Sequence, residues 1–264
     1  MSDFAAGATP ITIAYWNIKG LAAPLRMLAM YAGIAFVAKC YALDETFDRS
    51  EWLEKDKPAL KDQNPFMNLP YVRDGNKLIS QSNSCLSYLA RKAGMWSSDE
   101  EEIILIETLL CELMDLRNTV VRFAYSATPD KVKDFLDSSR NILMKIENYL
   151  KQQSSQFSIE TPFLVGGRVT APDFHFYELL IQIDQINNIY TAYTDTAVFQ
   201  DMPNVSSYFI AFGNLPRMQA YLASPLASLP ANNLMANCGS LGNGGKWEAG
   251  TELPFNADGW TFSG

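Results

Sequence analysis

The spacing of hydrophobic residues in the first half of the chain changes repeatedly between two periods. The apolar, β-branched run ITIAYW at residues 11–16 is typical of a buried strand. The stretch LAAPLRMLAMYAG then repeats apolar residues at helical spacing and stops at Gly33, a residue type that commonly ends helices. The run FVAKCYA at residues 36–42 predicts a second strand. A charged, irregular stretch is expected from Asp44 to Gln63.

A hairpin and a further helix are predicted next. The run NLPYVRDGNKLIS predicts two strands around a turn at Asp74 to Asn76. The run QSNSCLSYLARKAG predicts a helix that begins near Ser82 and ends at Gly94. The order is therefore β-α-β, a β-hairpin and a helix. This order predicts a thioredoxin-like α/β domain over residues 10–94.

The pattern from residue 98 to 222 is helical and predicts an all-α domain without strands. A long helix opens with SSDEEE, which suits the positive end of a helix, and DKVKDFLDSSRNILMKIENYLKQQ reads as an amphipathic helix. Thr170, Pro172 and Asp173 predict a capping box before FHFYELLIQIDQI, which is apolar nearly all round and should be central. Residues 223–264 hold seven of the 15 glycines, which predicts an irregular C-terminal extension.

Composition narrows the class of protein. A chain of 264 residues with 48% hydrophobic residues can form two small folded domains, and its net charge of -8 argues against nucleic acid or an anionic membrane as partner. The N-terminus has no basic and apolar leader, and no apolar run reaches about 18 residues, so we expect a cytoplasmic protein without membrane insertion. Four cysteines without a CxxC motif and a single histidine predict reduced thiols and no metal site.

In a thioredoxin-like fold, the end of the first strand, the loop before the hairpin and the start of the following helix converge on one edge. The residues at these places are Tyr15–Trp16, Asn68–Pro70 and Gln81–Ser82. A cis peptide before Pro70 would leave the N–H and C=O of Leu69 free to pair with an extended peptide. The helix start at Ser82 can bind a carboxylate. The sequence therefore predicts a pocket for a small acidic peptide.

The motifs that surround these positions resemble those of the mu class of glutathione S-transferases. They are AYWNIKGLAAPLR, DRSEW, NLPYVRDGNKLISQSNSCLSYLARK and TAPDF, in the same order, and the likeness covers roughly residues 11–222. The resemblance implies a thioredoxin-like domain followed by a helical domain with an electrophile site. It also implies a cytosolic homodimer that conjugates glutathione to hydrophobic electrophiles in detoxification, without a metal.

The resemblance assigns the catalytic hydroxyl to Tyr15. A phenol with a pKa near 10 stays protonated at neutral pH and can donate a hydrogen bond to the glutathione sulfur. Stabilising the thiolate by about two pKa units needs around 3 kcal/mol, which suits a charge-assisted hydrogen bond in a partly dry site. The thiolate then attacks an electrophilic carbon. Tyr125 matches a second tyrosine that assists some electrophiles as a hydrogen-bond donor.

The remaining site residues are also carried over by resemblance. Trp16 and Leu21 match residues that line the glutathione site, and Trp52 matches the tryptophan at the glycyl end. Asn68 and Leu69 match the main-chain clamp on the cysteinyl part. The other matches are Gln81 and Ser82 at the γ-glutamyl carboxylate, Asp115 reaching the γ-glutamyl amine across the dimer, and Phe66 inserting into the partner subunit. An aromatic residue on a polar loop independently favours an interface at Phe66.

Several positions depart from the mu pattern. The position four after Trp52, where a lysine for the glycyl carboxylate is expected, holds Asp56, and Lys55 or Lys57 could replace it after a shift. The loop from Trp52 to Asn68 is about three residues longer than in the family, the segment before Trp52 is about two residues shorter, and the extension has no counterpart.

Two other readings of the sequence stay open. The chain could be a catalytically weak transferase-fold subunit or a hydrophobic-ligand carrier that docks through its extension. It could also be an isomerase or peroxidase that uses the same thiolate. We expect His175 to serve in core or interface packing, and Cys85 to take no part in thiol chemistry.

Overall fold

The computed structural model describes residues 9–41, 48–157, 163–190, 198–238 and 258–262. Within them the chain forms an α/β domain and a helical domain, as the sequence predicts. The strands are β1 (Ile11–Trp16), β2 (Phe36–Tyr41), β3 (Tyr71–Asp74), β4 (Lys77–Ser80) and β5 (Asp258–Phe262). The helices of the first domain are η1 (Gly20–Ala22), α1 (Ala23–Ala32), η2 (Glu51–Asp56), α2 (Lys57–Lys61) and α3 (Ser82–Lys92). Those of the second are α4 (Glu100–Ser126), η3 (Pro129–Lys131), α5 (Val132–Phe157), α6 (Ala171–Ile189), α7 (Pro203–Gly213), α8 (Pro216–Leu222) and η5 (Pro225–Ser228).

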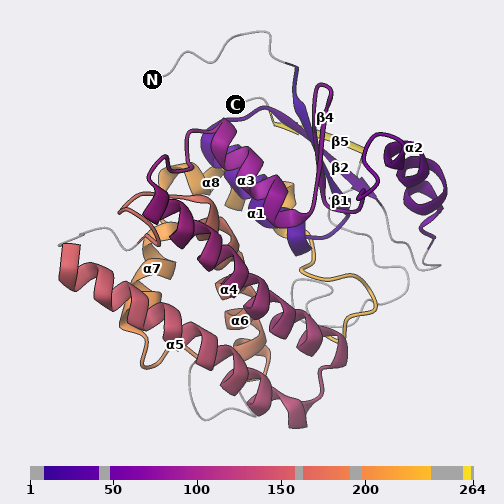
Figure 1. Ribbon diagram of the computed structural model, residues 1–264. Helices are drawn as coiled ribbons and strands as arrows, with labels where there is room; N and C mark the ends of the chain where they lie inside the picture. The colour runs from indigo at the N-terminus through magenta and orange to yellow at the C-terminus, as the bar shows by residue number, and fades with distance from the viewer. Residues whose placement is uncertain (1–8, 42–47, 158–162, 191–197, 239–257, 263–264) are drawn as a thin grey trace.

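The sheet has the strand order β4-β3-β1-β2-β5 (Figure 1). β1 pairs with β2 in parallel, with Tyr15 opposite Cys40, and with β3 in antiparallel. The predicted hairpin is confirmed, since β3 and β4 are antiparallel and joined at Gly75, whose φ of 56° needs a residue without a Cβ. The first four strands with α1 and α3 form the predicted thioredoxin-like core.

Local capping signals set the ends of the main helices. α1 ends at Gly33 in the left-handed conformation, as its sequence predicts. At the start of α6 the Asp173 carboxylate accepts hydrogen bonds from the Thr170 N–H at 2.7 Å and the Thr170 hydroxyl at 2.8 Å, which confirms the capping box. α6 is buried along most of its length and lies at the centre of the helical domain.

The two domains share one hydrophobic core. α1 packs on α6 and α8, and α4 packs on α5 and α6. Figure 1 shows α1 and α3 between the sheet and the helical bundle, so that the end of β1 lies at the junction of the domains. This junction is where the sequence places its candidate residues.

Two predictions of irregular structure are wrong. The stretch from Asp44 to Gln63 contains η2 and α2, which the buried side chains of Trp52 and Leu60 anchor to the domain. The extension contains η5 and also β5, which pairs antiparallel with β2 and adds a fifth strand. Its register places Trp260 opposite Ala38, with an irregularity between Ala38 and Lys39.

Removing β5 tests its contribution. Deleting residues 258–264 exposes the N–H and C=O groups of the β2 edge. We expect the free energy of unfolding in urea to fall by about 1–2 kcal/mol, because several net hydrogen bonds are lost while less chain has to be ordered. Deleting residues 263–264 alone is the control. An unchanged unfolding midpoint in the longer deletion would contradict the pairing.

Candidate active site

Tyr15 ends β1 with its ring buried at the domain junction. Its side chain is 7% exposed, and its hydroxyl oxygen accepts a hydrogen bond from the Leu21 N–H. Burial raises the pKa of the phenol above 10.0, although the charges of Arg117 and Arg26 and the Leu21 N–H offset part of this effect. Tyr15 is therefore protonated at neutral pH, and its O–H is available as a donor.

The turn after β1 fits closely around this ring. Gly20 has a φ of 39°, and a Cβ built on it would lie 2.6 Å from the Tyr15 Cε1 atom. Only a glycine leaves room for the ring at this backbone conformation. The turn is held from outside by the C-terminal segment, because the Lys19 N–H donates to the Pro230 carbonyl at 2.8 Å and the Gly20 N–H to the Ala231 carbonyl at 3.1 Å.

Arg26 supports the same turn from within α1. Its side chain is fully buried, and Nη1 donates to the Ile18 carbonyl at 2.9 Å while Nη2 lies 3.4 Å from Cys40 Sγ. This links the helix behind the site to the loop in front of it. The predicted positions Tyr15 and Leu21 are thus joined by a hydrogen bond within a turn that three segments hold.

The loop before β3 presents a short stretch of unpaired backbone. The Leu69–Pro70 peptide is cis. Asn68 is fixed by Ser80, whose Oγ accepts from the Asn68 N–H at 3.0 Å and donates to the Asn68 carbonyl at 3.2 Å. No hydrogen bond between the described residues uses the N–H or C=O of Leu69. Leu69 can therefore pair with an extended peptide chain.

The start of α3 carries an unusual backbone conformation. Gln81 has a φ of 72° and is the one non-glycine residue with positive φ in the described part of the chain. Such conformations cost free energy and often occur at binding sites. Ser82 follows at the first position of α3, half-buried, and lines a small cavity together with Leu21 and His175. The predicted Gln81–Ser82 pair thus adjoins the Tyr15 turn.

Trp52 lies at the other end of this edge within an aromatic cluster. Its side chain is 1% exposed, and its ring is stacked with Tyr71 at 6.0 Å between centroids. Trp16 contacts the neighbouring Tyr41 ring edge-on at 6.2 Å. Trp16 and Leu69 both pack against the Trp52 cluster and against the Tyr15 cluster, so the two clusters adjoin.

The segment that begins with Trp52 winds as a π-helix. In η2 the Lys57 N–H donates to the Trp52 carbonyl five residues earlier, instead of four as in an α-helix. Lys57 therefore follows Trp52 on the helix surface where Asp56 would follow it in an α-helix. The Lys57 ammonium lies 5.8 Å from the centre of the Trp52 ring and 3.4 Å from Asn68 Oδ1.

Asp56 instead contacts two side chains of β2. Its carboxylate forms an ion pair with Lys39 of β2 and accepts a hydrogen bond from the Tyr41 hydroxyl at 2.6 Å. Burial raises the pKa of Asp56, but the hydrogen bonds from Lys39 and Tyr41 outweigh it and lower the pKa overall. Lys55 is exposed and belongs to neither group.

Tyr125 lies near the end of α4, 38% exposed, with its hydroxyl oxygen accepting the Asn233 N–H. Burial raises the pKa of Tyr125 above 10.0. The C-terminal segment is fixed further along, since the Asn237 N–H donates to the Ala124 carbonyl at 2.7 Å. Residues 229–238 therefore contact both predicted tyrosine regions and form a wall between them.

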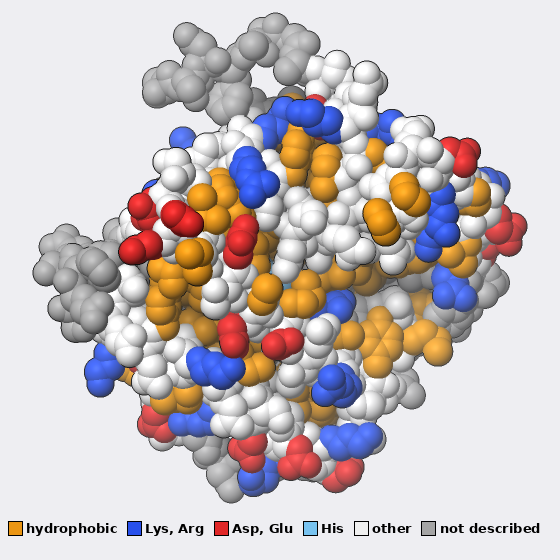
Figure 2. All heavy atoms as spheres, in the orientation of Figure 1, with side chains coloured by type: hydrophobic (Ala, Val, Ile, Leu, Met, Phe, Trp, Pro, Cys, Tyr) orange, Lys and Arg blue, Asp and Glu red, His pale blue; other side chains and the backbone are white. Residues whose placement is uncertain are grey.

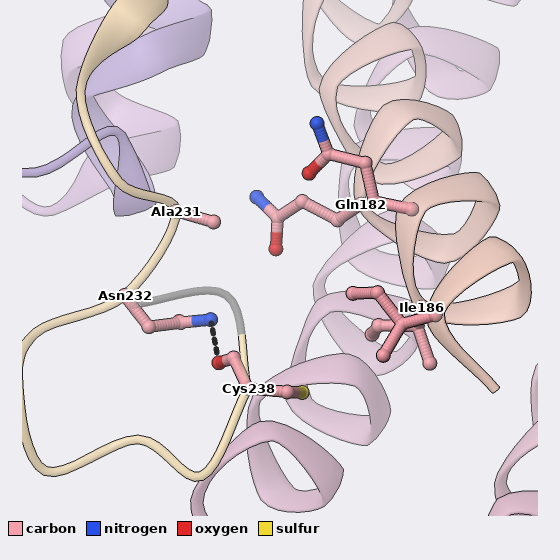
Figure 3. A pocket seen from close by; sticks show the side chains of 7 residues that line it. Gln182, Ile186, Ala231, Asn232 and Cys238 are labelled. Atoms are coloured by element: carbon pink, nitrogen blue, oxygen red, sulfur yellow. Dashed lines mark hydrogen bonds between the residues drawn. The ribbon is translucent and has the colours of Figure 1, made fainter. Parts of the chain in front are cut away.

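A cavity lies between α6 and the C-terminal segment. Figure 2 shows hydrophobic side chains gathered along the junction between the two domains. Behind the wall a cavity of about 260 Å³, including the solvent at its mouth, separates α6 from the C-terminal segment (Figure 3). Its lining includes Gln182, Ile186, Asn232 and Cys238, and Asn232 Nδ2 donates to the Cys238 carbonyl at 3.4 Å.

Phe66 and Asp115 are not joined to the other predicted residues. Phe66 is 78% exposed on the loop before β3. Asp115 is exposed on α4, where its carbonyl accepts a hydrogen bond from the Thr119 hydroxyl. Within one chain neither side chain reaches the Tyr15 turn, so their predicted roles require a second copy.

Two other titratable residues are accounted for by burial. Burial raises the pKa of Cys85 to about 12, so its thiol is protonated at neutral pH. Burial, with a smaller effect of Arg117, lowers the pKa of His175 to about 4. His175 is 3% exposed and neutral at pH 7. It packs against the cavity beside Ser82 and so lies closer to the site than its sequence position indicates.

Sequence reasoning overlooked Arg26, Arg117 and Asn233. Arg117 had a usable signal, because it lies four residues after Leu113 and three before Val120, both fully buried on α4. Asn233 had none, since its contribution comes from the backbone N–H. Among the described residues, no group of three His, Cys, Asp or Glu side chains is arranged to hold a metal ion.

Two family models and several known proteins match this chain. Residues 11–91 match the family described as glutathione S-transferase, N-terminal domain, and residues 114–225 match glutathione S-transferase, C-terminal domain. Glutathione S-transferase Mu 1 of Oryctolagus cuniculus is 34% identical over 217 residues, covering 81% of this chain and 91% of the relative.

Two further glutathione S-transferases are similar to this chain. Glutathione S-transferase Mu 3 of Homo sapiens is 33% identical over 234 residues, covering 87% of this chain and 96% of the relative. The crystal structure of the glutathione S-transferase Blo t 8 superposes with a TM-score of 0.65 at 28% identity, covering 86% of this chain and 99% of that chain.

The fit between Gly20 and Tyr15 is directly testable. We expect Gly20→Ala to displace the Tyr15 ring, because the new Cβ would lie 2.6 Å from Cε1. The measurement is ¹⁹F NMR of fluorotyrosine-labelled protein, with the Tyr15 signal assigned through Tyr15→Phe. The control is Gly75→Ala, which carries similar backbone strain at a φ of 56° but meets no atom within 4 Å. Equal Tyr15 shifts in both variants would refute the contact.

Proposed function

The chain belongs to the glutathione S-transferase family, with mu-class relatives, and we propose that its Tyr15 activates glutathione for conjugation to hydrophobic electrophiles. The observation that carries this proposal is the buried, protonated phenol of Tyr15 whose oxygen already accepts the Leu21 N–H. In that hydrogen bond the Tyr15 oxygen is the acceptor. The Tyr15 O–H remains available to donate a hydrogen bond.

Donation to sulfur favours the thiolate. A free thiol has a pKa near 8.5 and is mostly protonated at neutral pH. A hydrogen bond from Tyr15 that stabilises the anion by around 3 kcal/mol lowers this pKa by about two units. The thiol proton leaves to solvent, and the sulfur attacks the electrophilic carbon. A carbon–sulfur bond forms, the bond to a leaving group breaks, and that group departs with the electron pair.

The peptide substrate is held along the edge that the predicted residues form. The unpaired N–H and C=O of Leu69 suit the cysteinyl part of an extended peptide. Gln81 and Ser82 at the start of α3 offer hydrogen-bond donors to the γ-glutamyl carboxylate. Trp16 and Leu21 line the intervening surface.

Lys57 is our choice for the glycyl carboxylate. The π-helix places its ammonium beside Trp52 and Asn68, whereas Asp56 is engaged by Lys39 and Tyr41. Lys55 is exposed, and its charge acts on Asp56. In the mu class a lysine four residues after the tryptophan supplies this positive charge. We assign the same role here to Lys57, which lies five residues after Trp52.

The electrophile binds between the turn at Leu21, Tyr125 and the wall of residues 229–238. Leu21 and most residues of the wall other than its asparagines are apolar, which suits hydrophobic substrates. Tyr125 can donate to a polar atom of the electrophile, since its oxygen accepts from Asn233 in the way that Tyr15 accepts from Leu21. Conjugation in detoxification follows as the biological role.

We assign the active unit as a homodimer in the cytoplasm. Phe66 is 78% exposed, an unfavourable state for a phenyl ring that insertion into a partner subunit would relieve. Asp115 is exposed on α4 and would reach the γ-glutamyl amine from that partner. No helix in the described ranges is long and apolar enough to span a bilayer.

Replacing Tyr15 tests the central step. We expect Tyr15→Phe to raise the pKa of the bound glutathione thiol by about two units and to slow conjugation of chlorodinitrobenzene near pH 7 about 25-fold, the ratio of the two thiolate fractions at that pH. The thiolate absorbance near 240 nm, followed as a function of pH, measures the first effect directly. Tyr88→Phe, whose hydroxyl contacts Asp74 on the hairpin, is the control. A wild type that binds no thiolate and conjugates nothing would overturn the proposal.

Replacing Lys57 tests the glycyl contact. We expect Lys57→Ala to raise the KM for glutathione about tenfold with little change in kcat, because one charged contact is lost from the ground state and transition state alike. Lys55→Ala removes the same charge from an exposed neighbour and should leave the KM unchanged. Glutathione esterified at the glycyl carboxylate should bind wild type and Lys57→Ala equally well. A larger effect from Lys55→Ala would reverse the assignment.

A further inference from the structure

A small cavity lies where α1, the start of α3 and α6 pack together. Its volume is about 180 Å³, including the solvent at its mouth, and its interior has room for about one water molecule. Three of its lining side chains are polar, namely Ser82, Asn83 and His175, and the others are apolar residues of η1, α1 and α3. The cavity therefore lies between the first turn of α3 and a histidine of the helical domain.

His175 brings a polar group to this buried position. Its side chain is 3% exposed and lines the cavity. A neutral imidazole has one N–H donor and one nitrogen acceptor. None of the hydrogen bonds between the described residues involves either nitrogen of the ring. Because an unpaired buried polar group costs free energy, we expect the imidazole to find its partner in the cavity.

The two polar side chains opposite His175 can share the same partner. The Ser82 hydroxyl can donate and accept, and it is half-buried at the first position of α3. Asn83 Nδ2 donates to the Leu110 carbonyl of α4 at 3.3 Å, which leaves Asn83 Oδ1 as an acceptor. A buried water molecule typically makes about three hydrogen bonds. His175, Ser82 and Asn83 supply that number.

We propose that a water molecule in this cavity links the His175 imidazole to the Ser82 hydroxyl, and that His175 is thereby a positioning residue for the γ-glutamyl carboxylate of glutathione. The inference rests on the proposed glutathione site, in which Ser82 binds that carboxylate. The water donates to Ser82 Oγ and leaves the Ser82 O–H directed at the carboxylate. A hydroxyl held in its binding orientation loses less freedom when the peptide binds, which strengthens binding. The effect falls on peptide affinity and not on the chemical step at Tyr15.

The affinity for S-methylglutathione tests this role, because its blocked sulfur cannot react. We expect its Kd, measured by calorimetry, to rise about fivefold in His175→Leu, as suits the loss of one net hydrogen bond. His175→Gln keeps a side chain that can bind water and should retain most of the affinity. The control for disturbed packing is Leu179→Met, a similarly buried position one turn further along α6.

A second peptide isolates the carboxylate. The analogue in which γ-aminobutyrate replaces the γ-glutamyl residue lacks only the α-carboxylate, so wild type and His175→Leu should bind it equally well. His175→Leu should also cause no further loss in a Ser82→Ala background. Equal losses on both peptides, no loss on S-methylglutathione, or a loss in Leu179→Met as large as in His175→Leu would each overturn the inference.

The link between His175 and Ser82 can be observed directly. His175 is the one histidine among the 264 residues, so ¹⁵N-labelled histidine in untagged protein reports on it alone. We expect its ring-nitrogen resonances to shift when S-methylglutathione saturates the wild type, and this shift to be lost in saturated Ser82→Ala. Resonances that do not respond in the wild type, or a crystal structure with no water density in the cavity, would overturn the inference.

None of these measurements requires turnover, so the inference and the proposed function can fail separately. A wild type that conjugates nothing to chlorodinitrobenzene, yet binds S-methylglutathione about fivefold more tightly than His175→Leu does, would refute the conjugation and support the role of His175. Normal conjugation, with equal binding of S-methylglutathione by wild type and His175→Leu, would refute the role of His175 alone.

Discussion

The contact between the Tyr15 ring and the turn at Gly20 is the constraint on which the site depends. The ring can approach because Gly20 has no side chain, and the approach brings the Leu21 N–H onto the phenol oxygen. Each of the other segments secures this turn. Arg26 holds the Ile18 carbonyl from α1, and the C-terminal segment accepts the N–H groups of Lys19 and Gly20. A single short turn thereby connects the first strand, the first long helix and the end of the helical domain.

The helical domain also supports the position of Tyr15. α6 is buried almost throughout and packs against α1, which starts directly behind the turn. Because close-packed interiors transmit displacement, a shift of α6 would move α1 and the phenol with it. The segment at residues 229–238 adds a second route, since it contacts the turn at one end and Tyr125 and the carbonyl of Ala124 at the other. The two tyrosines are coupled through backbone hydrogen bonds to one strip of chain.

Local signals allowed much of this to be predicted from sequence. Glycine and capping residues at Gly33 and Thr170 determine where elements end, and alternating or helical spacing determines their type. The failures have non-local causes. η2 and α2 have few apolar residues, and burial of Trp52 against Tyr71 stabilises them. β5 exists through pairing with a strand more than two hundred positions earlier, which periodicity cannot reveal. The Asn233 contact uses a backbone N–H, which every residue type except proline carries.

The charges that act on Tyr15 are positive, whereas the net charge of the whole chain is negative. The net charge is -8, and glutathione is itself an anion, so long-range forces oppose binding. Exposed charges more than about 10 Å away are largely screened at ordinary ionic strength, whereas charges at a partly dry junction are not. Arg26 lies behind the turn that follows Tyr15, and the charges of Arg117 and Arg26 both act on the Tyr15 hydroxyl. Both charges lower the pKa of the Tyr15 phenol, so that Tyr15 meets a locally positive environment.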